Sequence, residues 1–276
     1  MQRPGRSKEA RCEQRPYKNL MIRKNMCGRN LLAGYVMNKG FKLSAVIMTF
    51  CVALSSDAMA AVGCTLSNPA QDIKFLFPEM TTYKEEVRQF DQMKNGKELF
   101  AELKERLGSD LDQVYETFET PYTLYTVFNG EKIIGYVHGV NVPGEGGVIQ
   151  IFMSVDPGTG DILRMFFQRI ESLVAKALKK KDFLGQFNGL SLADFYKHDY
   201  FTVVEPASTN DKIAQIKSPI PEGQASRDYT AALRGVRKDL ILLDIFVYNL
   251  KNEPFYKKAR EELAKKRKEK ETLTRP

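Results

Sequence analysis

The chain has 276 residues and a formal net charge of +8 at pH 7. The positive excess lies in residues 1–36 and 37–60, so the remainder of the chain is close to neutral and we set nucleic-acid binding aside. The residues after position 60 are numerous enough to form one good hydrophobic core, and they contain no apolar run long enough to cross a bilayer.

Residues 1–60 predict export. Residues 1–36 are basic and do not resemble a folded domain. From Met37 the chain has a short basic region, an apolar stretch from Leu43 to Leu54, and the small-x-small sequence Ala58-Met59-Ala60. This pattern is typical of a secretory signal peptide. We therefore expect a signal peptide at 37–60, with residues 1–36 either an artefact of start-site assignment or a disordered basic arm.

Cysteine use agrees with this interpretation. Cys12, Cys27 and Cys51 precede the predicted cleavage point, which leaves Cys64 as the one cysteine after it and excludes an internal disulfide. Residues 61–64, Ala-Val-Gly-Cys, also form an imperfect lipoprotein box, so lipidation of Cys64 is an alternative to ordinary cleavage after Ala60. Either route predicts a location in the periplasm or on the outer face of the cytoplasmic membrane.

Residues 61–118 predict an N-terminal helical segment. A helix from Asn68 to Phe77 is indicated by an Asn cap followed by proline. A second helix, from Lys94 to Leu107, shows helical spacing of apolar residues and has Gly108 in the position of a C-cap.

Residues 119–250 predict one domain built on a sheet. Apolar, β-branched runs follow Tyr122, and Asn129-Gly130 is positioned to supply the positive φ angles of a hairpin turn. Further strands are predicted at Val148–Val155, Ile162–Ile170 and Phe201–Val204. The expected fold is α+β, a twisted, mostly antiparallel sheet of about five or six strands with helices packed on one side.

The remaining segments are predicted to be helical. One helix is predicted to begin near Glu171, and a long one spans Gln224–Leu250 with apolar residues at helical spacing. Residues 251–276 form a charged tail, expected to be a solvated helix, with a membrane-surface or partner contact as the alternative.

Four motifs carry a family resemblance. They are Gly135-Tyr136 in a strand, the Gly-x-Gly-Gly-x-Ile step at 144–149, the Asp-x-x-Thr-Gly-x-Ile step at 156–162, and Asp-Phe-Leu-Gly-Gln-Phe-Asn-Gly at 182–189. Together they resemble the FMN-binding domain family, which includes FMN-carrying components of the sodium-pumping NADH:quinone oxidoreductase and of the related Rnf complex. The resemblance covers roughly residues 68–250.

This resemblance implies an FMN site at one end of the sheet. Family members usually bind FMN covalently, through its phosphate, to a threonine in a Ser-Gly-Ala-Thr motif, and a flavin transferase makes the bond. Thr230 occupies the equivalent place, but Arg227, Asp228 and Tyr229 replace the serine and the small residues. Covalent attachment is therefore doubtful, and Thr230 also fits the first turn of a helix.

Further candidate flavin contacts follow from the same resemblance. They are Gly144, Gly146 and Gly147 before a strand, Phe187, and Glu171 with Ser172. The family has Glu-Thr-Pro-Gly-Leu-Gly where this chain has Glu-Ser-Leu-Val-Ala, so Glu171 and Ser172 either line a pocket or cap a helix. The glycines are equally compatible with turn geometry alone.

No other chemistry is indicated. His138 and His198 are the two histidines, and no cluster has the spacing of metal ligands or of a nucleophilic triad. The predicted function is an exported FMN-binding protein that carries electrons to or from a membrane redox complex or a periplasmic cytochrome, with non-covalent flavin and no substrate of its own. One alternative is a degenerate, flavin-free binding or assembly module of an envelope complex. A third possibility, a small-ligand sensor domain, has no positive feature.

Overall fold

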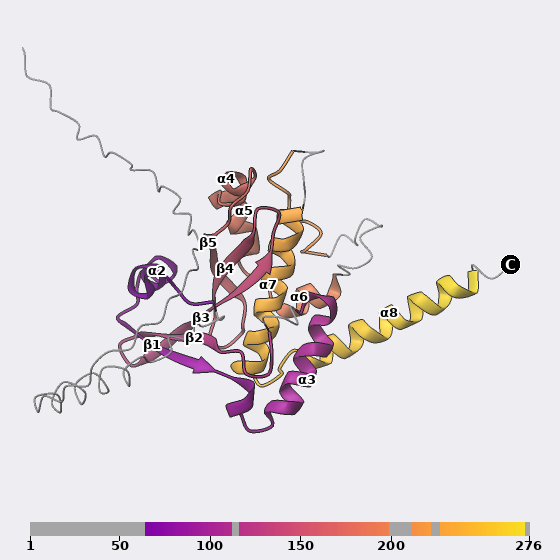
Figure 1. The fold of residues 1–276 in the computed structure, drawn as a ribbon, viewed down its shortest axis with the longest axis horizontal. Helices are drawn as coiled ribbons and strands as arrows, with labels where there is room; N and C mark the ends of the chain where they lie inside the picture. Colours follow the sequence, from indigo (N-terminus) through magenta and orange to yellow (C-terminus); the bar gives the residue numbers. More distant parts are fainter. Residues whose placement is uncertain (1–63, 112–115, 199–210, 222–226, 274–276) are drawn as a thin grey trace, which may run out of the picture. The chain divides into compact units, whose positions relative to one another are not determined.

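A computed structural model describes residues 64–111, 116–198, 211–221 and 227–273 (Figure 1). Its centre is a five-stranded antiparallel sheet in which strands adjacent in the chain are adjacent in space. The strands are β1 (Thr82–Arg88), β2 (Tyr122–Asn129), β3 (Lys132–Pro143), β4 (Val148–Val155) and β5 (Ile162–Arg169). This sheet, with helices packed against it, confirms the predicted α+β class.

The β2–β3 hairpin differs from its prediction by one residue. Asn129 pairs with Lys132, so the two loop residues are Gly130 and Glu131 rather than Asn129 and Gly130. Gly130 has a φ of 60°, whereas neither Asn129 nor Glu131 has a positive φ. A two-residue hairpin loop that needs a positive φ only at its first position explains why glycine stands there.

The edge strand β1 lies inside the segment predicted to be helical. It reads Thr-Tyr-Lys-Glu-Glu-Val-Arg and pairs with β2 along its whole length. Tyr83 packs against Tyr125 of β2 with ring centroids 6.1 Å apart. Four of its seven residues are charged, which suits a solvated edge strand but hides the strand from a search for apolar runs.

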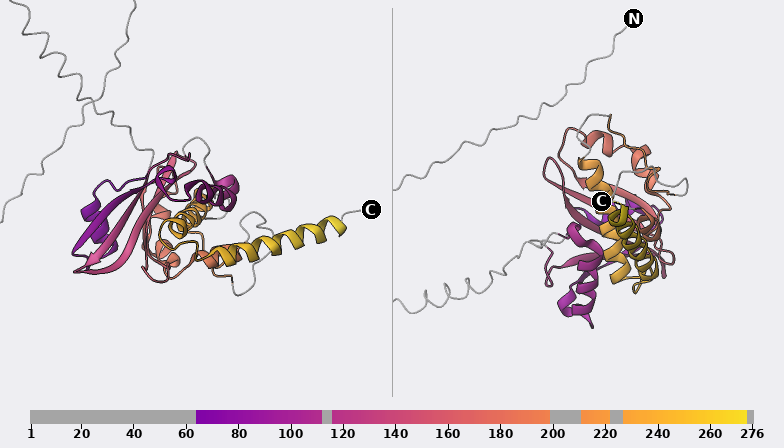
Figure 2. Two further views of the ribbon diagram at one scale, coloured as in Figure 1. Left: turned by 90° about the horizontal axis from the view of Figure 1, so that it is seen from below. Right: turned by 90° about the vertical axis from the view of Figure 1, so that its right-hand side faces the viewer.

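The two faces of the sheet carry separate cores. The larger core joins β2–β5 to α3 (Gly96–Leu107), α6 (Leu192–Lys197) and the long helix α7 (Arg227–Phe246). The smaller core, on the opposite face, joins Tyr125, Val127, Val137 and Phe152 to α2 (Pro69–Leu76) (Figure 2). The helices that frame the larger core are therefore on one side of the sheet, as predicted, and α2 covers part of the other.

Helix α7 crosses the sheet closely because it carries Gly235. A Cβ at this position would lie 2.5 Å from Ile151 Cδ1 and 3.2 Å from Val142 Cγ2, both side chains of the sheet. Any larger residue would hold the helix away from β3 and β4. The close approach brings polar residues of α7 into direct contact with β3.

Helix α7 is buried on all sides from Leu233 to Phe246, with Arg234 the one half-buried exception. Its buried charges are each paired with a different element. The pairs are Arg237 with Asp110, Lys238 with Glu116, Asp239 with His138, and Asp244 with Arg106. A buried charge is tolerated only when paired, so these contacts fix how α7 sits on its neighbours.

The shorter elements follow the sequence with one exception. Asn68 caps α2 by accepting from Gln71 N–H, and α3 ends at Gly108 with a φ of 55°, as predicted. The helix predicted to begin near Glu171 instead begins at Ala175, so Glu171 and Ser172 lie in a loop. The remaining elements are α4 (Ala175–Leu178), α5 (Lys181–Leu184), the 3₁₀ turns Phe90–Gln92, Gly108–Asp110 and Gly185–Phe187, and α8 (Glu253–Leu273).

Helix α8 occupies the predicted charged tail, and its C-terminal part extends away from the body (Figures 1 and 2). The predicted signal peptide and the predicted strand Phe201–Val204 lie outside the described residues. Within the described residues, no helix combines the length and apolar character that a bilayer crossing requires.

Cys64, the alternative lipid-attachment position, is 5% exposed and packs in the smaller core. Burial raises the pKa of its thiol. A diacylglycerol on Sγ would require Cys64 to leave this core, so lipidation stays a prediction that carries a packing cost.

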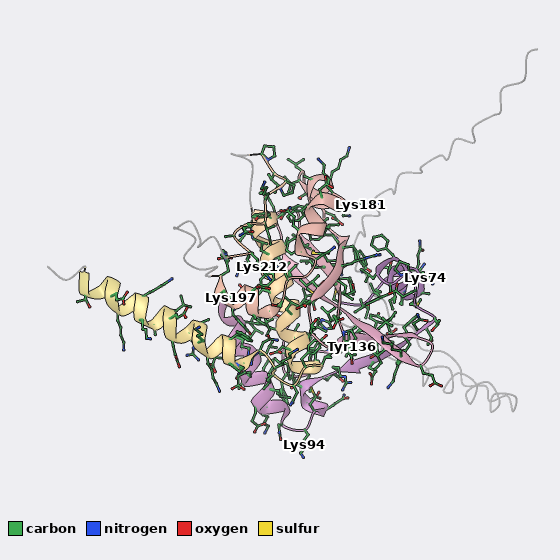
Figure 3. All side chains as sticks on the ribbon, turned by 180° about the vertical axis from the view of Figure 1, so that it is seen from behind. Lys74, Lys94, Tyr136, Lys181, Lys197 and Lys212 are labelled. Carbon is green, nitrogen blue, oxygen red and sulfur yellow. The ribbon has the colours of Figure 1, made fainter. Side chains whose placement is uncertain are left out.

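Asp194 provides a test of local stability. Its carboxylate forms a capping box with Ser191 at the start of α6 and pairs with Lys197 and Lys212, which lie close together in Figure 3. Burial alone would raise the pKa of Asp194, but hydrogen bonds from Ser191 and Lys212 lower it overall. The stabilisation is therefore present above the ordinary carboxyl pKa and is lost as pH falls through the lowered value.

We expect Asp194→Ala to lower the free energy of unfolding by about 0.5–2 kcal/mol at neutral pH, because the capping box loses the carboxylate that accepts from Ser191 and pairs with Lys212. The difference from wild type should shrink in acid, where Asp194 is protonated. Urea unfolding at both pH values measures this. Asp182→Ala, at an exposed carboxylate in the first turn of α5, is the control and should change stability by less than about 0.5 kcal/mol.

Candidate functional site

Two loops predicted to hold a flavin meet at the end of the sheet. The loop between β3 and β4 contains Gly144, Gly146 and Gly147, and the loop after β5 contains Glu171 and Ser172. A Cβ at Gly146 would lie 1.3 Å from the carbonyl oxygen of Glu171, so the two backbones are in direct contact. We call these two loops, together with Asp228, the glycine junction.

Asp228 fastens the glycine junction to the first turn of α7. Its side chain is 0% exposed, and Oδ1 accepts a 2.6 Å hydrogen bond from the backbone N–H of Glu145. A Cβ at Gly144 would lie 2.8 Å from the same oxygen. Asp228 Oδ2 and Ser172 Oγ are buried, and neither has a hydrogen-bond partner among the described residues.

A groove of about 510 Å³ lies beside the junction, within the volume range of about 300–1,000 Å³ typical of ligand sites. The first turn of α7 forms one wall, and Thr230 lines it. The lining residues are Ser109, Asp110, Leu111, Val142, Pro143, Arg227, Thr230, Ala231, Arg234 and Lys238. Pro143 directly precedes Gly144 and Arg227 directly precedes Asp228, so the groove lies next to the glycine junction. We call it the α7 groove.

Basic side chains outnumber acidic ones in the lining of the α7 groove. Three basic side chains line it, Arg227, Arg234 and Lys238, against the acidic Asp110. Arg234 Nε donates to Asp110 Oδ1 at 2.6 Å, and buried Lys238 pairs with Glu116 and donates to the carbonyl of Asn141 at 3.1 Å.

The predicted site residues fall into three places. Gly144, Gly146, Glu171 and Ser172 come together in the glycine junction, where Gly147 has a φ of 126° and open space around it. Thr230 lies apart from them in the groove and is exposed. Phe187 is 0% exposed and packs edge-on against Phe183 in the larger core, and it lines neither the groove nor the junction.

Sequence reasoning missed the charged residues of this region. Asp110, Arg234 and Lys238 belong to no motif, and the sequence identifies Asp228 only as a departure from the Ser-Gly-Ala-Thr motif. The sequence does contain a signal for two buried charges. Lys238 and Asp239 lie at helical spacing from the apolar residues of α7, in positions that such a helix normally buries. Among the described residues, no group of three or more His, Cys, Asp or Glu side chains could hold a metal ion.

The chain is an α+β domain with a groove, lined by three basic side chains, along the flank of its central helix. No family model matches the chain, and no curated protein matches it. Among solved structures, NqrC of Shewanella oneidensis is similar at a TM-score of 0.40 and 14% identity, over 73% of this chain and 94% of that one.

Proposed function

We propose that this chain is a flavin-binding electron-transfer protein that holds FMN without a covalent bond in the α7 groove. The observation that carries the proposal is the position of Thr230. The motif resemblance assigns this residue to the flavin phosphate, and it lies in a groove of sufficient volume that Arg227, Arg234 and Lys238 also line. FMN, when bound, supplies the electron-carrying chemistry, while the protein binds and orients it.

The chain's own residues divide this task. Arg227 would bind the phosphate, with Thr230 beside it in the wall of the groove. Val142, Pro143 and Leu111 supply apolar wall for the ring. Tyr229 does not crowd the groove, because its hydroxyl donates to the carbonyl of Ile216 at 2.8 Å.

A second candidate, the flavin-free binding module, is favoured by the glycine junction. The resemblance places the flat ring against the loops that contain Gly146 and Glu171. Their backbones already touch, which leaves no room for a ring between them. FMN binding therefore requires the α7 groove itself to take the ring.

The test is an absorbance spectrum and an intact mass of the full chain, produced in cells that contain a flavin transferase. We expect the protein to be yellow and to have the mass of the bare polypeptide. We also expect flavin-depleted protein to quench the fluorescence of added FMN. An added mass of one FMN, removed by Thr230→Val, would show covalent attachment instead. Colourless protein that leaves FMN fluorescence unchanged would overturn the carrier and leave the binding module.

Charge reversal in the groove gives a matched pair of variants. Arg227→Glu should weaken FMN binding at least about tenfold, a change of about 1.4 kcal/mol, because an exposed cation at the phosphate end becomes an anion. Lys258→Glu makes the same change of charge on exposed α8 and should leave the Kd for FMN unaltered. Equal weakening by both variants would contradict binding in the groove.

The site of action is part of the same proposal. An exported protein with the predicted signal peptide at 37–60 would exchange electrons with a membrane redox complex or a periplasmic cytochrome. Cell fractionation with N-terminal sequencing tests it. Mature protein that begins at Ala61 in the periplasmic fraction supports export, whereas uncleaved protein in the cytoplasm contradicts it.

A further inference from the structure

A wholly buried histidine–aspartate pair lies where α7 crosses β3. His138 Nδ1 is hydrogen-bonded to Asp239 Oδ1, and both side chains are 0% exposed. The other polar atom of each, His138 Nε2 and Asp239 Oδ2, has no hydrogen-bond partner among the described residues. A buried polar atom without a hydrogen-bond partner destabilises a protein core, so each such atom in a native structure calls for an explanation. Here each unpartnered atom is a position at which a proton can bind.

The surroundings of this pair contain few charges. Strand β2 contributes Tyr122, whose ring centroid lies 6.2 Å from that of His138 and whose buried hydroxyl has no partner among the described residues. Strand β4 contributes Met153 opposite His138, and α7 contributes Phe246 at 6.1 Å. The nearby ionised groups are Lys238 and its partner Glu116, while the Cys64 thiol interacts electrostatically with Asp239.

Lys238 connects the pair to the α7 groove. It lines the groove, precedes Asp239 in α7, and donates to the carbonyl of Asn141 on β3, three residues from His138. Burial raises the pKa of Asp239, and the charges of His138 and Lys238 oppose that rise. Glu116 already pairs with Lys238, so an anion in the groove would add negative potential near the pair and increase its affinity for protons.

We propose that His138 and Asp239 form a buried proton-binding site coupled to the α7 groove, at which His138 Nε2 takes up one proton when an anionic ligand binds. The starting state of the proposed step has Nδ1–H donating to the Asp239 carboxylate and no proton on Nε2. The added proton comes from solvent, no bond of the ligand changes, and the product is an imidazolium–carboxylate pair. With FMN as the anion, this inference rests on the proposed function.

The sequence makes the test direct, because the chain contains two histidines. In ¹⁵N-histidine-labelled full-length protein, NMR reports the protonation of each ring nitrogen. His198, hydrogen-bonded to Asp211 at 2.7 Å, is the internal control and is assigned with His198→Gln. Saturating FMN near neutral pH should convert His138 Nε2 to its protonated form and leave His198 unchanged. Arg227→Glu should show no conversion at the same FMN concentration.

Binding constants give a second readout. Uptake of one proton makes the Kd increase by up to about tenfold per pH unit above neutrality, where the phosphate of FMN no longer titrates. Bound FMN, shown by quenched fluorescence, with unchanged His138 Nε2 overturns the inference and leaves the proposed function intact. If FMN does not bind, inorganic pyrophosphate is the probe. Protonation of His138 Nε2 on addition of pyrophosphate would support the inference even though the proposed function had failed. An unchanged His138 Nε2 would overturn the inference together with the proposed function.

Discussion

Replacing Asp239 with alanine is expected to lower the free energy of unfolding by about 2–3 kcal/mol, because the buried Nδ1–H of His138 is left without its hydrogen-bond acceptor. The variant leaves His138 in the larger core with neither ring nitrogen bonded to Asp239. It also leaves Lys238 with Glu116 but without the nearby carboxylate. Urea unfolding at neutral pH measures the loss.

The matched control replaces both partners. His138→Leu with Asp239→Leu removes two buried polar groups and fills the space with apolar atoms, so it should be markedly more stable than Asp239→Ala alone. A double-mutant cycle then gives the coupling energy of the pair. If Asp239→Ala unfolds at the same urea concentration as wild type, the pair does not fasten α7 to β3.

Gly146→Ala is expected to produce the second large effect. The new Cβ would lie 1.3 Å from the Glu171 carbonyl oxygen and 2.5 Å from its carbonyl carbon. Both are backbone atoms and cannot rotate away, so the two loops of the glycine junction must separate. We expect a loss of about 3 kcal/mol, at the upper end of the usual cost of overpacking, and a fall in melting temperature of about 6–12 °C.

Gly185→Ala is the control for this variant. Gly185 has a φ of −64°, and a Cβ there would meet no atom within 4 Å. Its melting temperature should stay at or slightly above that of wild type, because alanine restricts the unfolded chain. A wild-type melting temperature for Gly146→Ala would show that the two loops are not in contact in solution.

The elements with strong local signals were predicted correctly. Strands β2 to β5, helix α2 with its Asn68 cap and helix α3 with Gly108 at its end each depend on periodicity, capping or turn chemistry within a few residues. Strand β1 was missed because an edge strand with four charged residues owes its structure to β2 rather than to its own pattern. The loop at Glu171 was missed for a related reason, since its contact with Gly146 is 25 residues away in the chain.

The sequence by itself determined the α+β class, the presence of β2 to β5, α2, α3 and α7, and the family resemblance that points to Gly144, Gly146, Glu171, Ser172 and Thr230. These depend on local patterns, which act before the chain folds. Only the tertiary structure decided that Phe187 is core, that Asp228 fastens the glycine loop, and that Lys238 and His138 lie buried near a groove. Such charges acquire their role from partners brought near by folding, and burial without those partners would be prohibitively costly.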